Sequence, residues 1–382
     1  MKKQKLQSLL LSLDYKLEIT QSRFLKPDDL NEFLMHLSSR FTVSQIGTSV
    51  NAYPLHSIKW GIGKTRVFLW SQMHGNESTT TRALINLLFL MDKHPSLFSE
   101  IYQELELLII PLVNPDGSFV LSRYNANGVD LNRDAINLSE PESKILMNTY
   151  ASFQPEYCLN LHGQRSIFSV KKKYAVMSFL APSYNASQSI NSSRKKSMGL
   201  VVQAARSLYA NGLSGNIGRY DETFNKNCFG DYFQSRGSTT ILVEAGQAQL
   251  DFNRDQSVYY SRLSLFSILE SISKNFTDED LVNEYYNIPM NEKLFSDLMV
   301  KNVYVNNGVF NIVARYDVRL TDNEIIYIPI VEKITEKLIP SHRLIDADFN
   351  SLTGVDQVAI QQIEIGEELP KLTINSVNFS LF

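Results

Sequence analysis

The central part of the chain alternates between short apolar runs and stretches with helical periodicity. Four apolar runs each have the length of one buried strand: 66–70, 105–112, 157–161 and 239–243. Stretches with apolar residues at helical spacing follow them in turn: 79–92, 141–153, 195–210 and 257–272. Strands that alternate with helices predict an α/β protein with a doubly wound sheet flanked by helices.

The two ends of the chain have different patterns. Residues 1–40 carry apolar positions at helical spacing and predict an N-terminal helical segment, with a second helix from Pro27 to Leu37. Residues 41–60 predict an antiparallel pair of strands before the first buried strand. Past residue 284 the pattern is one of short strands between turns: 303–305, 309–313, 324–328, 359–360 and 372–374. We therefore expect two domains, 1–283 and a small β-rich domain at 284–382.

Composition and charge narrow the class of protein. With 382 residues, 43% hydrophobic and 20% charged, the chain is ordinary for a globular protein. A net charge of -3 provides no basic field for nucleic acid or an acidic membrane surface. No apolar run reaches the roughly 18 residues that a membrane-spanning helix needs, so we expect no membrane partner.

Cysteine usage and the N-terminus bear on the compartment. The first five residues, Met1–Lys5, form a basic segment, and the apolar run that follows is interrupted at Ser12 after a few residues. We therefore expect an amphipathic helix rather than a signal peptide. Cys158 and Cys228 lie far apart in the sequence, and we expect both to be reduced. Both observations favour a cytoplasmic protein.

Polar residues that follow the predicted strands carry the candidate chemistry. His74 and Glu77 follow the first buried strand, an Asn-Pro-Asp-Gly turn at 114–117 follows the second, and His162 and Glu244 follow the third and fourth. Ligands of an open α/β sheet bind at the carboxyl ends of its strands. Two imidazoles and one carboxylate leave a fourth position open on zinc, as catalytic sites require. We predict one Zn²⁺ per chain, held by His74, Glu77 and His162.

Glu244 is the candidate general base and acid. A catalytic zinc site uses a further carboxylate to take a proton from water and to pass it to the leaving amine. Glu244 ends a very apolar strand, where a carboxylate is costly unless it has a partner or a function.

Together these motifs resemble the zinc carboxypeptidase family, or funnelins, which includes pancreatic carboxypeptidase A and bacterial murein peptide amidases. The matching pieces occur in the family's order: His74–Glu77, Asn114–Gly117, Gly128–Arg133, Leu161–Gly163 and Val243–Gly246. The resemblance implies a mixed eight-stranded sheet, and some members carry a small β-sandwich after it. It also implies that Arg123 helps zinc to stabilise the oxyanion and that Asn132 and Arg133 bind the substrate's terminal carboxylate.

Some roles stay open at this point. Arg133 could instead form a salt bridge with Asp130 or Asp134, and Arg123 could be a solvated loop residue. The tyrosine that caps the substrate in the family could be Tyr220 or Tyr232. Three charged residues nearby could each line the substrate pocket: Arg219, Asp221 and Glu222.

The resemblance implies a zinc metallocarboxypeptidase, a hydrolase that cleaves the amide bond beside a free carboxylate of a peptide or acyl-amino-acid substrate. An amidase or deacylase for murein peptides or N-acyl amino acids would share the zinc site and differ in its pocket. A non-catalytic binding protein of the same fold is the third alternative, and the presence of Glu244 argues against it. The sequence leaves the oligomeric state open.

Overall fold

The computed structural model describes residues 17–276, 279–305, 308–321, 324–346, 363–369, 372–374 and 377–379. These residues divide into two compact units. The first takes its described residues from Met1–Gln164, Ala175–Gln247 and Asp251–Asn291, and the second from Arg165–Tyr174, Ala248–Leu250 and Glu292–Phe382. Residues 1–16, the first part of the predicted N-terminal helical segment, lie outside the described residues.

The first unit is built on one mixed sheet of eight strands. These are β1 (Thr42–Thr48), β2 (Pro54–Trp60), β3 (Thr65–Ser71), β4 (Leu105–Ile110), β5 (Tyr157–Gly163), β8 (Met177–Leu180), β9 (Ile217–Arg219) and β10 (Thr239–Ala245). Their order is β1-β2-β4-β3-β5-β10-β8-β9. The four central strands β4, β3, β5 and β10 run parallel, so their carboxyl ends meet at one edge. This confirms the predicted fold class.

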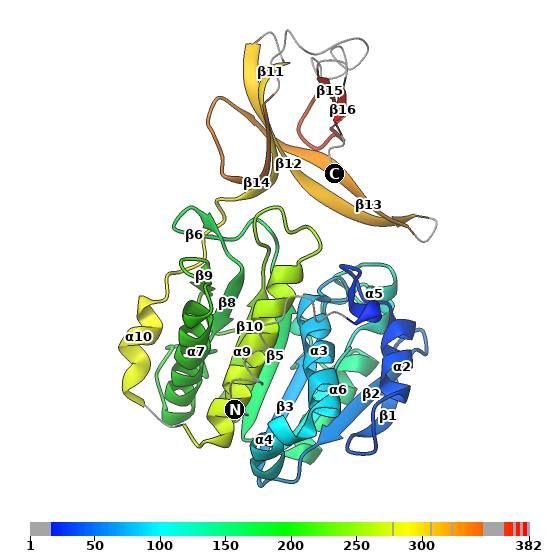
Figure 1. The fold of residues 1–382 in the computed structure, drawn as a ribbon, viewed down its shortest axis with the longest axis vertical. Coiled ribbons are helices and arrows are strands. Elements are labelled where there is room, and N and C mark those ends of the chain that lie inside the picture. Colours follow the sequence, from blue (N-terminus) through cyan, green and yellow to red (C-terminus); the bar gives the residue numbers. More distant parts are fainter. Residues whose placement is uncertain are drawn as a thin grey trace. The chain divides into compact units, whose positions relative to one another are not determined.

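Helices cover both faces of this sheet. They are α2 (Pro27–Met35), α3 (Thr79–Lys93), α4 (Ser99–Glu104), α5 (Pro115–Phe119), α6 (Pro141–Phe153), α7 (Ser192–Ala210), α8 (Phe229–Ser235), α9 (Asp255–Ser273) and α10 (Val282–Asn287), with 3-10 turns at Glu18–Thr20, Pro95–Leu97, Leu131–Arg133 and Glu279–Leu281. The long helices α3, α9 and α7 lie side by side along one face (Figure 1). On the opposite face, α6 and α8 enclose a core with Phe68, Trp70 and Cys158 of β3 and β5. No helix in the described ranges is long and apolar enough to cross a membrane.

Two strands of the sheet lie in segments whose sequence has no clear strand pattern. The strand β8 falls in the Ser- and Tyr-rich segment 165–189, and β9 falls in the polar segment 213–237. Both are short, with four and three residues, and β9 is an edge strand. Segments this short carry too few positions for a readable periodicity.

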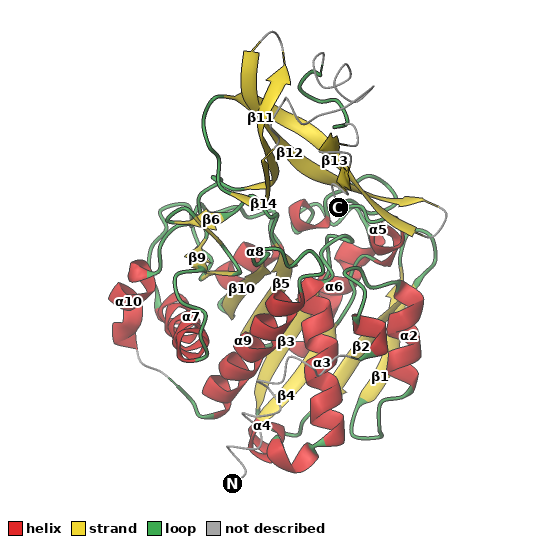
Figure 2. Cartoon of the chain, turned by 45° about the horizontal axis from the view of Figure 1, so that its top comes forward, coloured by secondary structure: helices red, strands yellow, loops and turns green. Residues whose placement is uncertain are grey.

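The second unit contains strands and loops, with no helix among its described residues (Figure 2). Its main sheet has the order β13-β12-β11-β14, formed by β11 (Ser296–Val305), β12 (Gly308–Thr321), β13 (Glu324–Thr335) and β14 (Ser341–Asp346). Two small hairpins accompany it, β6 (Ser169–Val170) with β7 (Lys173–Tyr174) and β15 (Leu372–Ile374) with β16 (Val377–Phe379). A β-rich C-terminal part is therefore confirmed. The predicted strand at 359–360 lies outside the described residues.

Candidate functional site

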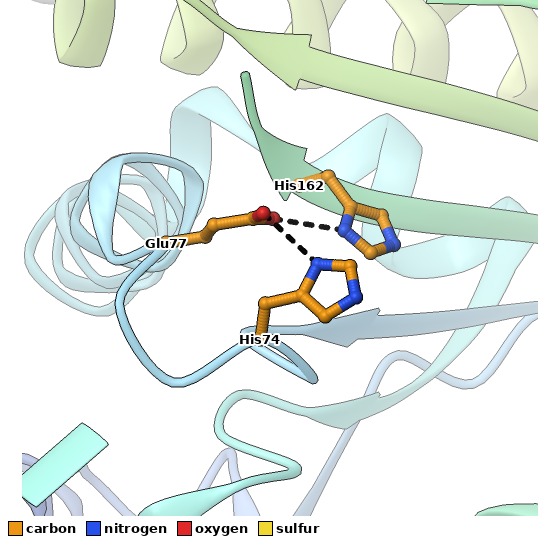
Figure 3. Close-up of side chains that lie close together, drawn as sticks. All are labelled: His74, Glu77 and His162. Carbon is orange, nitrogen blue, oxygen red and sulfur yellow. Dashed lines mark hydrogen bonds and ion pairs between the residues drawn. The ribbon is translucent and has the colours of Figure 1, made fainter. Parts of the chain in front are cut away.

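Three predicted metal ligands meet at the carboxyl edge of the central strands. His74 and Glu77 lie in the turn between β3 and α3, where the Glu77 amide donates to the His74 carbonyl at 3.0 Å. His162 comes from the end of β5, the neighbour of β3 in the sheet. One ligand atom from each residue lies within 4.8 Å of the others (Figure 3).

The Glu77 carboxylate lies between the two imidazoles, as Figure 3 shows. Its Oε1 is 2.9 Å from Nδ1 of His74, and its Oε2 is 2.9 Å from Nδ1 of His162. The Gly163 amide also donates to Oε2 at 2.9 Å, which fixes the carboxylate. Zinc binds imidazole nitrogen at about 2.0–2.1 Å, so donors of one tetrahedral ion lie about 3.3 Å apart. Two nitrogens and a carboxylate this close together fit one zinc ion in both donor type and spacing.

Asp130 organises two of the predicted residues, a role that sequence reasoning missed. Its Oδ1 is 3.0 Å from Nε2 of His74, so the nitrogen that faces Glu77 is Nδ1. Its Oδ2 accepts from Nε and Nη2 of Arg123 at 3.0 and 2.9 Å. A metal-binding histidine commonly donates its second nitrogen to a carboxylate, which fixes its tautomer and orientation. By that rule, the presence of a carboxylate within the Gly128–Arg133 motif is the one signal in the sequence for the role of Asp130.

Burial and neighbouring charges shift the pKa values of His74, Glu77 and His162 in different directions. Burial alone would lower the pKa of His74, but the charge of Glu77 and the bond to Asp130 raise it to about 9. Burial alone would also raise the pKa of Glu77, yet the two imidazoles hold it well below its usual range. Burial lowers the pKa of His162 despite its bond to Glu77. The carboxylate is therefore charged in the range where proteins function, as a metal ligand must be.

The strand register places Glu244 beside His162. Glu244 of β10 pairs with His162 of β5 in the parallel ladder, so both side chains project from the same face. Among the described residues, none forms a hydrogen bond with the buried Oε2 of Glu244. Burial and then the charge of Glu77 raise the pKa of Glu244 well above its usual range. A raised pKa favours the protonated carboxyl group, which is the form that can donate a proton to a leaving group.

The predicted carboxylate clamp lies on a second loop of the site. Arg133 donates to the Asn132 carbonyl at 2.7 Å and contacts Sγ of Cys228 at 3.1 Å. The side chain of Asn132 accepts from the Phe229 amide at 3.2 Å, which joins the loop to the start of α8. Asp130 pairs with Arg123 rather than with Arg133. The guanidinium of Arg133 is exposed and faces solvent.

Of the two tyrosine candidates, the structure brings Tyr220 to the site. After burial, the charge of Glu244 is the largest cause of the raised pKa of Tyr220, and its hydroxyl donates to Gln164 at 2.9 Å. Tyr232 instead lines a separate surface pocket of about 630 Å³, together with Pro155 and Glu156 ahead of β5. That pocket lies at the opposite ends of the strands.

Two of the three charged pocket candidates, Glu222 and Arg219, form an ion pair with each other. Glu222 accepts from Arg194 at 2.6 Å and from Arg219 at 2.9 Å, and Tyr286 also donates to it. Asp221 caps Thr223 at the surface. The pair of Glu222 with Arg194 is buried, so this cluster braces the loop after β9.

Comparison with known proteins agrees with this geometry. A family model described as zinc carboxypeptidase matches residues 28–257, which is more than half of the chain. Carboxypeptidase 2 of Trichophyton tonsurans is 30% identical over 99 residues, 26% of this chain and 18% of that protein. Carboxypeptidase SOL1 of Arabidopsis thaliana is 31% identical over 170 residues, 38% of this chain and 34% of that protein. The matches thus span about a fifth and about a third of these two relatives.

Solved structures share the fold at low sequence identity. A metallo-carboxypeptidase from Burkholderia cenocepacia has a TM-score of 0.54 at 15% identity, with 66% of this chain and 71% of that chain covered. The carboxypeptidase A from Helicoverpa armigera has a TM-score of 0.53 at 16% identity, with 72% and 82% covered. Because the family model matches most of the eight-stranded unit, the chain belongs to the zinc carboxypeptidase family.

Proposed function

We propose that this protein is a zinc metallocarboxypeptidase that hydrolyses the amide bond next to the terminal carboxylate of a peptide. The observation that carries the proposal is the register of β5 and β10. It sets Glu244 beside a cluster of two imidazoles and a carboxylate that suits zinc. We assign the reaction to residues 1–283 and leave the β-rich residues 284–382 outside the chemistry.

Zinc held by His74, Glu77 and His162 would polarise the scissile carbonyl and lower the pKa of a water molecule. Glu244 accepts the proton of the attacking water and later donates it to the leaving amine. The guanidinium of Arg123, which Asp130 holds with its Nη1 3.5 Å from Glu77 Oε1, donates to the oxyanion as negative charge develops.

Arg133 and Asn132 anchor the substrate by its terminal carboxylate. A guanidinium can donate two parallel hydrogen bonds to one carboxylate, which fixes both position and orientation. Arg133 is exposed and pairs with no carboxylate of the described residues, so its remaining N–H groups can reach a ligand. An anchored substrate places the adjacent amide over the three ligand residues.

The first test is Glu244→Gln in the zinc-loaded protein. Gln has nearly the same shape but cannot accept the proton, so kcat should fall about 10²–10⁴-fold. Metal analysis should show zinc retained, because Glu244 is outside the ligand set. The half-buried Glu270 on α9, which pairs with Lys274, provides the matched control, and Glu270→Gln should leave kcat unchanged. Full activity of Glu244→Gln would refute the proposed mechanism.

A second test separates a carboxypeptidase from an amidase or deacylase. Arg133→Leu should raise KM for a free-carboxylate peptide about tenfold or more, because a charged hydrogen-bond partner is lost. Blocking the peptide's terminal carboxylate as an amide should have a similar effect on the unmodified protein. Equal turnover of the blocked and free peptides would favour an enzyme that does not recognise a terminal carboxylate.

A further inference from the structure

Solvent reaches the face of the sheet that carries Glu244 one step further along β10, at Leu242. In β10, five of seven residues are buried, and the two that solvent reaches are Leu242 and Glu244. Residues two apart in a strand project from the same face, about 6.6 Å apart. Solvent access therefore continues from Glu244 to Leu242 in one of the central strands, and we call the space over Leu242 the hollow.

The floor of this hollow carries an amide group. Leu242 pairs with Asn160 of β5 on one side and with Leu180 of β8 on the other. Asn160 is only 3% exposed, and within the described ranges its Oδ1 has no hydrogen-bond partner. Such an unpaired buried polar group is costly and is uncommon in proteins. On the other side of Asn160, Trp70 is fully enclosed, so the opening lies on the Leu242 side.

The start of α8 connects this floor to the carboxylate clamp. A Cβ atom at Gly230 would lie 3.3 Å from Nδ2 of Asn160 and 3.8 Å from Pro182, so the glycine keeps the space over the amide open. Cys228, two residues earlier, contacts Arg133. Asn160 itself lies two residues before the ligand His162. A substrate residue held between the clamp and the metal ligands would therefore place its side chain near Asn160.

We propose that Asn160 selects the C-terminal residue of the substrate, and that the preferred side chains are the uncharged carboxamides of asparagine and glutamine. The inference rests on the proposed carboxypeptidase function and adds its substrate class. A side-chain amide offers both a donor and an acceptor, which an amide partner satisfies in full. Leu242, Leu180 and Pro182 supply apolar walls for the methylene part of the side chain.

Charged C-terminal side chains of a substrate are disfavoured, because the nearby carboxyl groups of the described residues already have partners. The nearest carboxyl group on α8 belongs to Asp231, and it already accepts from the Asn225 amide at 3.2 Å. Glu222 is held by Arg194 and Arg219. A lysine or glutamate side chain would have to lose its hydration beside a neutral amide, which is unfavourable.

The experiment uses blocked dipeptides whose C-terminal residues form pairs of equal size, asparagine with leucine and glutamine with methionine. For the full-length zinc-loaded protein, kcat/KM should be about tenfold or more higher for the carboxamide in each pair, since a site built for hydrogen bonding rejects its apolar isostere. Asn160→Leu should reduce this ratio about tenfold or more. Asn86→Leu, another buried asparagine on α3, should leave the ratio unchanged.

A binding measurement separates this inference from the proposed reaction. Titration of the Glu244→Gln protein with the same dipeptides gives the ratio of Kd values without turnover. Preferential binding of carboxamides without hydrolysis by the unmodified protein would refute the reaction and support the pocket. Hydrolysis with equal or better use of leucine and methionine would refute the pocket and support the reaction. Should Asn160→Leu not fold, Asn160→Asp keeps the size and should shift preference towards a C-terminal lysine; an unchanged preference would overturn the inference.

Discussion

Asp130 fixes two side chains of the candidate site with one carboxylate. Hydrogen bonds and charges from His74 and Arg123 outweigh the effect of burial and hold the pKa of Asp130 below its usual range. Asp130→Asn removes this charge, so His74 loses its fixed tautomer and Arg123 its ion pair. Zinc affinity should fall about 10–100-fold, as for other residues that orient a metal ligand. Competition with a coloured chelator measures it.

The exposed Asp221→Asn provides the matched control, because Asp221 only caps its own loop. Its zinc affinity should equal that of the unmodified protein. Unchanged zinc affinity and kcat/KM in Asp130→Asn would show that Asp130 does not organise the site.

Residues whose role depends on a local motif were predictable from the sequence. The metal-ligand candidates and Glu244 each follow an apolar strand, and the carboxyl ends of parallel strands meet at one edge. Asp130 and Asn160 were not singled out, because their significance depends on contacts across the sheet. One partner of Asp130 lies 56 residues away, and the importance of Asn160 depends on Leu242 and Gly230.

At the scale of elements, the turn after β3 and the helix α5 meet backbone to backbone at the edge of the sheet. A Cβ atom at Gly75 would lie 2.0 Å from the carbonyl carbon of Gly117 and 2.2 Å from the Ser118 nitrogen. Asn114, which precedes α5, joins the same two elements, since its side chain donates to the Met73 carbonyl at 3.2 Å. The turn that carries His74 and Glu77 therefore has room for glycine alone at position 75.

Gly75→Ala should reduce the free energy of unfolding by about 1–3 kcal/mol, the usual cost of overpacking, and should weaken zinc binding. Chemical denaturation followed by circular dichroism measures the loss. Gly128→Asn is the control, because Gly128 has φ +75 with open space around it and asparagine tolerates that conformation. If Gly75→Ala were as stable as the unmodified protein, the turn after β3 and α5 could move apart without a loss of stability.

Element prediction failed where strands were short. The long helices and the four central strands repeat their pattern often enough to be read from the sequence, whereas β8 and β9 have four and three residues. Their pairing depends on β10 and on each other, which no local window contains. These two strands nevertheless complete the side of the sheet that holds Leu180 beside Leu242.

For the whole molecule, zinc should contribute to stability. A ligand that binds only the folded protein stabilises it by about 2.7 kcal/mol at 100 times its Kd. Removal of zinc with a chelator should lower Tm by roughly 5 °C or more, and added zinc should restore it. Scanning calorimetry at fixed protein concentration measures both.

The double variant His74→Ala, His162→Ala should show no such response to zinc. The exposed His36→Ala should respond like the unmodified protein. A Tm that zinc raises equally in the double variant would place the stabilising metal at a different site.

The division of the chain into two units has a consequence for its synthesis. Residues 165–174 follow His162 closely and residues 248–250 follow Glu244, yet both belong to the second unit. Ser169 pairs with Glu292, Ser166 accepts from His342, and Gln249 donates to the carbonyls of Ser341 and His342. During synthesis on the ribosome, neither segment can form these contacts until the last quarter of the chain has been made. A truncated protein that ends near residue 283 would contain every proposed catalytic residue but would leave both segments without their partners.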